Sequence, residues 1–470
     1  MGVGSGKGHW RRRLGSRSTF RNTTATSHGR CSSPSHWMAR WRRFSRASET
    51  RSTASRSLLP PPSSLLPPPV YFGAHEPHCP GGPPMQFRYE PDVEEFRREV
   101  RAFIAAELPP IDERPRQFAS LNDEYEYTMG FQKKLAARDW LAMAWPREYG
   151  GGGASHMRQL VYNEEMAYAA APVGNMGIAW VGPSLMLYGT EEQKQRFIPR
   201  ITGADDWWCT LYSEPGAGSD LAALQTRAER DGDDYVLNGQ KIWTSGGHLA
   251  DWGWLAARTD PDVPKHKGIT MFTVNIKSPG VTVRPLINIA GHHGFNEVFF
   301  EDVRVPATQV VGEVNRGWYH MAVALDFERS GIQAYAGGRR SVERLVRTAK
   351  ERRWLVSQRP GIRQELADRA LEVNVGTFLA YRVATMQARG LVPNHEASAS
   401  KLFGSEMSQR IALTGMHLLG ALGQLRDESK HEVIDLASGY MTAVAATIAA
   451  GTSEVQRGII ATRGLGLPRG

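Results

Sequence analysis

The sequence predicts an α+β protein with helices at both ends of the folded region and strands between them. Apolar residues recur at helical spacing after Met85, give way to short strand patterns bounded by turn residues, and later return to helical spacing. Strands and helices do not alternate, which argues against a Rossmann-type fold. We expect an N-terminal helical domain over 85–205, a central antiparallel β-barrel or sandwich domain over 206–312, and a C-terminal four-helix bundle over 313–470.

The basic character of the chain is confined to its first part. The 470 residues carry a formal net charge of +9, but residues 1–84 hold thirteen basic residues against two acidic ones, so the remainder is slightly acidic. A nucleic-acid-binding function would rest on that segment alone, and we expect none. Its richness in Arg, Ser, Gly and Pro predicts disorder. We favour a misassigned start, with translation from Met85, over a mitochondrial transit peptide.

Composition excludes several other classes of protein. The hydrophobic content of 41% and the charged content of 22% are ordinary for a water-soluble protein, and no stretch is long and apolar enough to cross a bilayer. The cysteines Cys31, Cys79 and Cys209 have neither metal-ligand spacing nor the spacing of a disulfide framework. We therefore expect no membrane span, no metal site and a reducing compartment.

Local patterns predict the elements of the first two domains. In the helical domain, apolar spacing predicts one helix after Asp92 and further helices over 122–138, 156–171 and 191–201. In the β domain, two short apolar runs flank Asn238-Gly239, a pair that favours a hairpin turn. Further strands are expected over 269–276, 281–286 and 297–300.

Two segments with small residues are candidate parts of a site. The loop 213–220 (SEPGAGSD) would let backbone N–H groups approach a polar ligand closely, although an ordinary strand-to-loop turn fits the same spacing. Near the C-terminus, Ser453 and Gln456 have the spacing of a capping box at the start of a last helix.

Glu328 interrupts an apolar stripe in the first part of the C-terminal region. Helical spacing would place Met321, Leu325, Glu328 and Ile332 on one face. A carboxylate there is costly unless it is paired or used. The residues alone favour a structural ion pair, with Arg329 or Arg339 as partner.

Five segments together resemble the acyl-CoA dehydrogenase family, and they follow the family's order between about residue 85 and residue 468. They are 145–151 (WPREYGG), 213–220 (SEPGAGSD), 238–243 (NGQKIW), 296–306 (NEVFFEDVRVP) and 451–457 (GTSEVQR). One such segment would be a weak signal, but five in order are specific. The resemblance implies FAD-dependent α,β-desaturation of an acyl-CoA thioester, in which a carboxylate removes the α-proton and the β-hydrogen leaves as hydride to flavin N5.

The resemblance also implies which residues contact cofactor and substrate. Cofactor contacts are expected from Thr210, Leu211, Tyr212, Ser213, Gly218, Trp243, Ser245, Thr452 and Glu454. Substrate contacts are expected from Ser219, Asp326, Arg329, Ala450 and Gly451. A tryptophan in a strand is more often a core residue, so the assignment of Trp243 depends on its match to the motif.

The C-terminal segment lacks the glutamate that many members use as base, and Ala450 stands in its place. Alanine keeps the backbone N–H that in the family holds the thioester carbonyl. In the isovaleryl-type and long-chain branches the base lies on an earlier helix, immediately before an arginine, as in Glu328-Arg329. The resemblance therefore favours Glu328 as the catalytic base over a structural ion pair.

Two stretches depart from the family. Residues 350–355 (KERRWL) lack its Arg-x-x-Phe-Gly segment, and 417–423 (HLLGALG) match its later glycine-rich segment only in part, which leaves the pyrophosphate and adenosine contacts open. Similar departures occur in bacterial members that act as two-gene heterotetramers, often on steroid or other bulky acyl-CoAs. We expect either a homotetramer or a heterotetramer with a sister subunit, in which case this chain would be inactive alone.

The family resemblance also implies an electron acceptor and a location. An electron-transfer flavoprotein is the expected acceptor, and the bacterial cytoplasm is expected rather than the mitochondrial matrix. An acyl-CoA or nitroalkane oxidase is a variant of the same chemistry. A non-catalytic scaffold is the remaining alternative, and the retention of Glu328, Ser219 and Trp243 argues against it.

Overall fold

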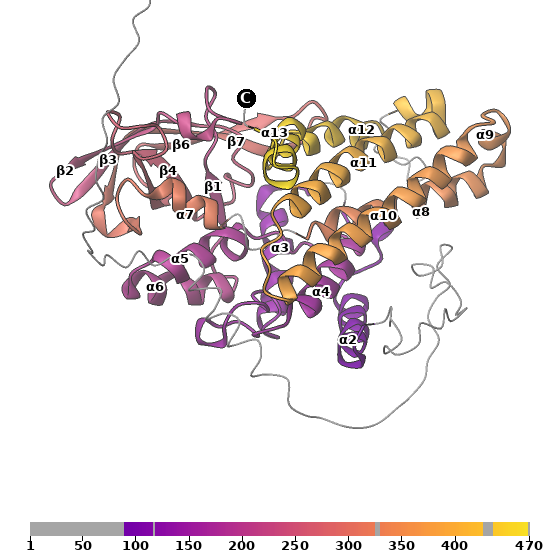
Figure 1. Ribbon diagram of the computed structural model, residues 1–470, viewed down its shortest axis with the longest axis horizontal. Coiled ribbons are helices and arrows are strands. Elements are labelled where there is room, and N and C mark those ends of the chain that lie inside the picture. Colours follow the sequence, from indigo (N-terminus) through magenta and orange to yellow (C-terminus); the bar gives the residue numbers. More distant parts are fainter. Residues whose placement is uncertain (1–88, 116–117, 325–329, 426–435, 469–470) are drawn as a thin grey trace, which may run out of the picture.

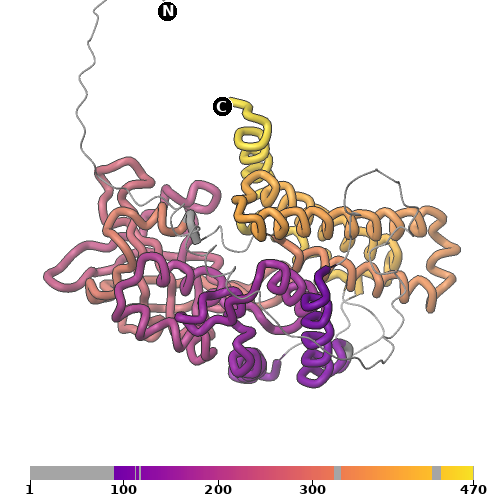
Figure 2. Tube along the Cα trace, turned by 60° about the horizontal axis from the view of Figure 1, so that its bottom comes forward, coloured from indigo at the N-terminus to yellow at the C-terminus, as the bar shows by residue number. Residues whose placement is uncertain are grey.

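The computed structural model describes residues 89–468, apart from 116–117, 325–329 and 426–435. Helices, a sheet and a second set of helices follow one another along the chain (Figure 1). The sheet forms one half of the molecule and the long C-terminal helices form the other, with the N-terminal helices along one side of both (Figures 1 and 2). The predicted fold class is confirmed.

The N-terminal helices bury the apolar stripes that predicted them. They are α2 (Pro91–Glu107), α3 (Leu121–Ala136), α4 (His156–Tyr168), α5 (Gly182–Tyr188) and α6 (Glu191–Thr202). In α2 the buried residues are Val93, Phe96, Val100 and Phe103, spaced by three or four positions. Helix α6 begins with a capping box in which Thr190 and Gln193 exchange side-chain and backbone hydrogen bonds.

An eight-stranded sheet occupies the middle of the chain. Its strands are β1 (Trp208–Leu211), β2 (Arg227–Asp231), β3 (Asp234–Lys241), β4 (Trp252–Arg258), β5 (Ile269–Asn275), β6 (Val281–Ile287), β7 (His293–Pro306) and β8 (Val310–Val311). Their order is β6-β7-β3-β2-β4-β5-β8, and β1 pairs with β4. Most pairings are antiparallel, but β1 and β2 each run parallel to β4.

Both faces of the sheet are covered. Helices α5 and α6 lie on one face (Figure 1), where Leu185 and Phe197 pack with Trp208 and Trp254. The opposite side chains of the strands, such as Leu211, form a second core within the curved sheet. Because both sides of β1 are buried, the strand holds its C-terminal end in a fixed place.

The hairpin predicted at Asn238-Gly239 is wrong. Strand β3 runs straight through these residues and pairs with β7, and the register shifts between Leu237 and Gly239, as in a β-bulge. Gly239 has φ +149°, and a Cβ there would lie 2.7 Å from Thr226 Cα. The turn that joins β2 to β3 lies earlier, at Gly232-Asp233.

Most of the C-terminal helices pack side by side in a bundle, whereas the first of them packs against α5 and β5. They are α7 (Gly317–Ala324), α8 (Ile332–Glu351), α9 (Arg353–Ser357), α10 (Ile362–Ala388), α11 (His395–Leu419), α12 (Leu436–Ala443) and α13 (Ser453–Ile459). Helix α10 packs against α8 and α11, and α12 packs along α11. Arg340 on α8 donates to the carbonyls of Ala167 and Tyr168 at 2.6 and 2.8 Å, which joins the bundle to the end of α4.

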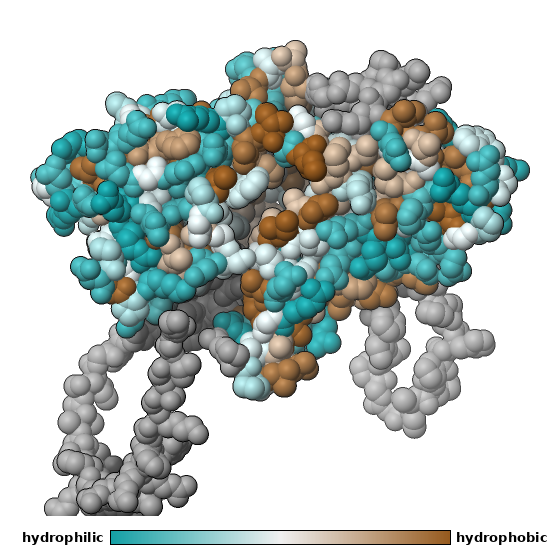
Figure 3. Space-filling view, turned by 90° about the horizontal axis from the view of Figure 1, so that it is seen from above, coloured by the Kyte–Doolittle hydropathy of each residue, from teal (hydrophilic) through white to brown (hydrophobic). Residues whose placement is uncertain are grey.

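The bundle exposes more apolar surface than the sheet on the face shown in Figure 3. On α10 the exposed residues Leu371, Val375 and Phe378 recur at helical spacing, and Tyr440 and Ile448 are exposed in and after α12. Such contiguous apolar surface is typical of subunit contacts. No helix in the described ranges has the length and apolarity that crossing a membrane requires.

Candidate active site

Two segments expected at the flavin lie side by side. The N–H of Ile242 donates to the carbonyl of Ser213 at 2.9 Å, so the residues that follow β1 run against those that follow β3. This contact brings Tyr212 and Ser213 next to Trp243, with Leu211 buried in the core beneath them. Two parts of the site separated in sequence therefore form one edge of the sheet.

A buried ion pair anchors this edge from inside. Lys241 is fully buried, and its Nζ donates to Glu214 Oε1 at 2.7 Å and to the carbonyl of Tyr212 at 3.2 Å. Glu214 also accepts from the backbone N–H groups of Gln225 and Thr226, at 2.6 and 2.9 Å. These contacts satisfy both charges without water and hold the loop after β1 against the end of β3.

Burial acts in opposite directions on the pKa values of the two partners, Lys241 and Glu214. Desolvation lowers the pKa of Lys241 to about 8, because it outweighs the attraction of the Glu214 carboxylate. Desolvation would raise the pKa of Glu214, but the charge of Lys241 and the surrounding donors lower it below its ordinary value. Both partners are thus kept charged at neutral pH.

Trp243 is presented to the outside at this edge. Its backbone has φ +60°, a left-handed conformation that a bulky residue rarely adopts, and the residue is 56% exposed. Beneath it, buried Asn296 donates to the carbonyl of Thr244 at 3.0 Å. A tryptophan held exposed in this way serves as a surface for a ligand better than as a core residue.

The same edge keeps polar groups available. Within the described residues, the N–H groups of Ser213 and Ser245 donate no hydrogen bond. Backbone donors normally have a partner, so these two N–H groups are candidates to bind polar atoms of a ligand.

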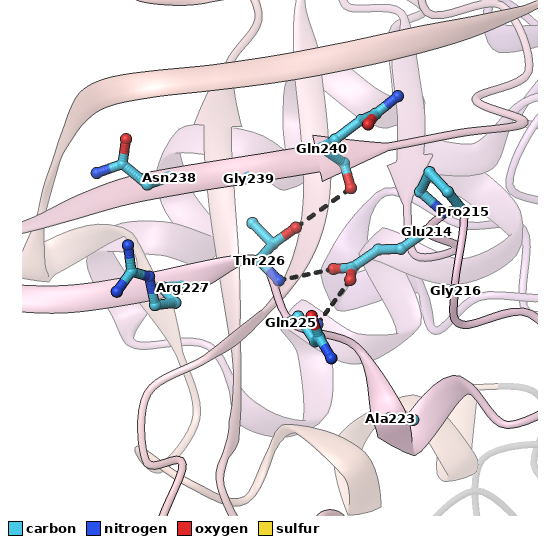
Figure 4. Close-up of a pocket in the computed structure, with 10 residues that line it drawn as sticks. All are labelled: Glu214, Pro215, Gly216, Ala223, Gln225, Thr226, Arg227, Asn238, Gly239 and Gln240. Carbon is cyan, nitrogen blue, oxygen red and sulfur yellow. Dashed lines mark hydrogen bonds between the residues drawn. The ribbon is translucent and has the colours of Figure 1, made fainter.

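The glycine-containing loop projects beyond this edge. Glu214 and Ala217 exchange two backbone hydrogen bonds of 3.0 Å, and the following Gly218 and Ser219 are exposed. A cavity of about 440 Å³ lies beside the loop, lined on its far wall by the β-bulge at Gly239 (Figure 4). A Cβ added at Gly216, on the cavity wall, would meet no atom within 4 Å, so the backbone there is open to a ligand.

The C-terminal segment has an unusual backbone at the position of the missing glutamate. Ala450 has φ +53° and Gly451 has φ +83°, and α13 begins two residues later. The N–H of Ala450 has no acceptor among the described residues, whereas its carbonyl accepts from the Gln456 side chain at 3.2 Å. The segment therefore has a free N–H in a held conformation.

The predicted capping box at Ser453 and Gln456 is wrong by one residue. Thr452 is the N-cap of α13, and its hydroxyl accepts from the N–H of Val455 at 3.2 Å. Gln456 bonds instead to the carbonyls of Ala450 and Gly451. Glu454 follows in the first turn with its side chain exposed.

Lys401, a residue of the helical bundle, binds the segment that contains Ala450. It lies on α11, and its Nζ donates to the carbonyls of Gly451 at 2.7 Å and Ala446 at 3.3 Å. No hydrogen bond or ion pair among the described residues joins residues 446–454 to the sheet edge at Trp243. The structure therefore brings the expected flavin contacts of the sheet together, but links Thr452 and Glu454 to the bundle.

Glu328, Asp326 and Arg329 lie outside the described residues. The described residues on either side of this segment belong to two different helices, since α7 ends at Ala324 and α8 starts at Ile332 after Gly331, whose φ is +68°. Met321 packs against the sheet and Ile332 packs inside the bundle, so the predicted stripe does not form one helix face. Arg339, one of the two arginines considered as partners of Glu328, forms an ion pair with Glu343 at 3.0 Å.

Sequence reasoning missed the side chains that hold the backbone of the candidate site in place. Lys241 lies within the family segment 238–243, and Lys401 is a lysine in a stretch of small and apolar residues, but neither pattern identifies the partner of the lysine. The role of Gln456 was hidden because it also matched a capping pattern. These residues act through the backbone of distant segments, and sequence spacing does not reveal such pairs.

Comparison with known proteins covers all three parts of the chain. Family models described as the N-terminal, middle and C-terminal domains of acyl-CoA dehydrogenase match residues 90–205, 209–303 and 315–465. The acyl-CoA dehydrogenase FadE26 of Mycobacterium tuberculosis is 38% identical over 403 residues, which cover 82% of this chain and 99% of that protein. IpdE1 of the same organism is 37% identical over 394 residues, covering 80% and 98%.

Solved structures agree with these matches. A structure described as the Tcur3481-Tcur3483 steroid ACAD has a TM-score of 0.73 and 36% identity, covering 82% of this chain and all of that one. The ChsE4-ChsE5 complex from Mycobacterium tuberculosis has a TM-score of 0.72 at the same identity and coverage. With full-length relatives and matches to all three domains, this chain belongs to the acyl-CoA dehydrogenase family.

Proposed function

We propose that this oxidoreductase desaturates an acyl-CoA thioester between its α and β carbons, with Glu328 as the base. The observation that carries the proposal is the backbone at Ala450. This residue replaces the base that many members use, yet it offers an unpaired N–H in a conformation held by neighbouring side chains. The arrangement suits an enzyme that has moved its base and kept its carbonyl donor.

The cofactor of the family, FAD, fits the edge of the sheet. The exposed ring of Trp243 offers a flat surface, and the unpaired N–H groups of Ser213 and Ser245 offer donors to a planar heterocycle with polar atoms at its rim. Tyr212, Thr452 and Glu454 remain proposed cofactor contacts. When bound there, FAD supplies the acceptor for the β-hydrogen, which leaves as hydride.

In this proposal, the protein's own residues bind the substrate carbonyl, remove the α-proton and contact the CoA moiety. The Ala450 N–H donates to the thioester carbonyl and stabilises the negative charge that builds on its oxygen as the α-proton leaves. Glu328 removes that proton, and Ser219 is proposed to contact the CoA moiety. A carbonyl donor and a base are both needed, because the α-proton is too weakly acidic for a carboxylate alone.

An anaerobic screen of acyl-CoA thioesters tests this function. We expect at least one thioester to bleach the oxidised flavin absorbance of the FAD-loaded protein, and the panel should include straight, branched and steroid side-chain acyl groups. The likeness to structures described as steroid ACADs supports a bulky acyl group. If no thioester bleaches the flavin, desaturation by this chain is excluded. Rapid reoxidation by oxygen would identify an oxidase, whereas the proposed acceptor is an electron-transfer flavoprotein.

A second candidate is a subunit that completes its flavin site with a sister chain. Two observations favour it: the apolar surface on α10 and around α12, and the similarity to the ChsE4-ChsE5 complex. Stretch 350–355 also lacks the family's usual pyrophosphate segment. In this case FAD binding would depend on the partner.

Flavin content after expression alone separates the two assemblies. If a sister chain completes the site, we expect well below one FAD per chain when the protein is purified alone, rising toward one per site when a neighbouring paralogue is coexpressed. The measurement is the ratio of flavin to protein absorbance, with mass determination of the complex. A full complement of FAD in a homotetramer would contradict the heteromer.

A further inference from the structure

Lys401 is the feature that the proposed chemistry leaves unexplained. It projects from the second turn of α11 and is half-buried against the segment that leads into α13. Its ammonium donates to two carbonyls of that segment, Gly451 at 2.7 Å and Ala446 at 3.3 Å. Hydrogen bonds from a charged donor are roughly twice as strong as neutral ones, so this is a firm attachment.

The two carbonyls flank the strained residue. Ala450 has φ +53°, a conformation that disfavours any residue with a Cβ and persists only when surrounding contacts impose it. On one side of Ala450 the Lys401 ammonium binds Ala446, and on the other it binds Gly451. The two ends of the segment from Ala446 to Gly451 are therefore held together by the ammonium group of Lys401.

Gln456 supports the loop from the other end. Its Nε2 donates to the carbonyls of Ala450 at 3.2 Å and Gly451 at 3.4 Å, and it is buried in the first turns of α13. The carbonyls of Ala446, Ala450 and Gly451 are therefore all engaged, while the Ala450 N–H has no acceptor among the described residues. The side chains fix the backbone by its carbonyls and leave the N–H free.

We propose that Lys401 is a positioning residue for the substrate carbonyl, because it holds the Ala450 backbone in the conformation that presents its N–H. This inference rests on the proposed function, in which that N–H binds the thioester oxygen. Lys401 itself touches neither substrate nor cofactor in this role. Its effect on the reaction is carried by the position of the Ala450 N–H, and a displacement of about 1 Å can cost 10²-fold in rate.

Two substitutions and a matched control test the role. Lys401→Met keeps the length of the side chain and removes its donors, and Lys401→Arg restores a charged donor. Gln409→Met is the control, because Gln409 lies on the same helix and bonds to the preceding part of the same segment, at Thr447 Oγ1, 2.9 Å away. All three are compared in the FAD-loaded protein, coexpressed with its partner if it needs one.

The decisive readout is the carbonyl stretch of a bound thioester carrying ¹³C at its carbonyl, measured by difference infrared spectroscopy. In the wild type the bound carbonyl should absorb at a lower frequency than in free solution, because the Ala450 N–H polarises it. Lys401→Met should return the frequency toward the free value and lower kcat about 10- to 100-fold with a smaller change in KM. Lys401→Arg should recover part of both, and Gln409→Met should keep both within about threefold of the wild type.

The outcomes separate the two proposals. A Lys401→Met protein that keeps the shifted carbonyl stretch and turns over like Gln409→Met overturns the role of Lys401 alone. A wild-type protein that turns over without any shift overturns carbonyl binding at Ala450, and Lys401 with it, but leaves desaturation standing. If Lys401→Met does not fold, Lys401→Ala, which also removes the donors, takes its place: loss of the shift at unchanged thermal stability supports the proposal, and a retained shift at full turnover overturns it.

Discussion

Replacing Glu328 with glutamine is expected to lower the turnover of acyl-CoA by about 10²- to 10⁴-fold while FAD stays bound. Glutamine keeps the size and polarity of the side chain but cannot accept the α-proton. The Ala450 N–H would still bind the thioester carbonyl, so substrate binding should change little. The measurement is the rate of anaerobic flavin bleaching, with flavin content determined on the same sample.

Two control variants accompany this prediction. Glu343→Gln changes a carboxylate on α8 that pairs with Arg339, and it should leave the bleaching rate within a few-fold of the wild type. Adding Ala450→Glu to Glu328→Gln places a carboxylate where other family members carry theirs, and should restore part of the rate. Near-normal turnover by Glu328→Gln alone would exclude Glu328 as the base.

Replacing Lys241 with methionine is expected to destabilise the protein by about 3–5 kcal/mol, because it leaves the Glu214 carboxylate buried without its cation. Lys241 is fully buried, and its loss also frees the carbonyl of Tyr212 from one hydrogen bond. FAD affinity should fall as well, since the ion pair holds the edge that carries Trp243. The free energy of unfolding in urea and the dissociation constant of FAD are the two measurements.

An exposed lysine provides the matched control. Lys277 also forms an ion pair, with Asp251 at 2.9 Å, but its side chain is 75% exposed, so Lys277→Met should cost at most about 1 kcal/mol. The double variant Glu214→Gln with Lys241→Met removes both charges and should recover part of the lost stability. Equal losses for Lys241→Met and Lys277→Met would contradict the importance of the buried pair.

The effect of the buried pair should depend on pH. The pKa of Glu214 is lowered in the folded protein, so its contribution to stability is present above its ordinary pKa of 4.5 and is lost as the pH falls through the folded value. In the Lys241→Met protein the unpaired carboxyl should instead gain from protonation. The unfolding free energies of wild type and variant are therefore expected to converge below about pH 4.5.

The order of helices, strands and helices could be predicted because the spacing of apolar residues within each segment indicates its secondary structure. The stripe Val93, Phe96, Val100 is buried in α2 as its spacing requires. The β-bulge at Asn238-Gly239 could not be predicted, because a hairpin and a β-bulge both use a residue with positive φ. The choice between them is made by β7, which pairs with β3 from some sixty residues away in the sequence.

The family resemblance predicted which segments of the sheet edge lie together, but not the side chains that hold the backbone of the last segment. The contact between Ser213 and Ile242 joins two recognised motifs. The bonds of Lys401 and Gln456 join side chains to carbonyls, and every residue has a carbonyl, so the sequence carries no mark of the partner. The adjacent hydroxyls of Thr452 and Ser453 likewise led to the prediction of Ser453 as N-cap, one residue after the true N-cap Thr452.

The contact between Ser213 and Ile242 also bears on the order in which the protein is made. Both segments leave the ribosome early, whereas Ala450 follows about 200 residues later, roughly 10–40 s at the usual pace of synthesis. The contact at the edge proposed for the cofactor can thus form on the nascent chain before Ala450, the residue proposed to bind the thioester, has been made. The part of the proposed flavin site that the sheet supplies would then precede Thr452 and Glu454, its proposed contacts in the last segment, by the same interval.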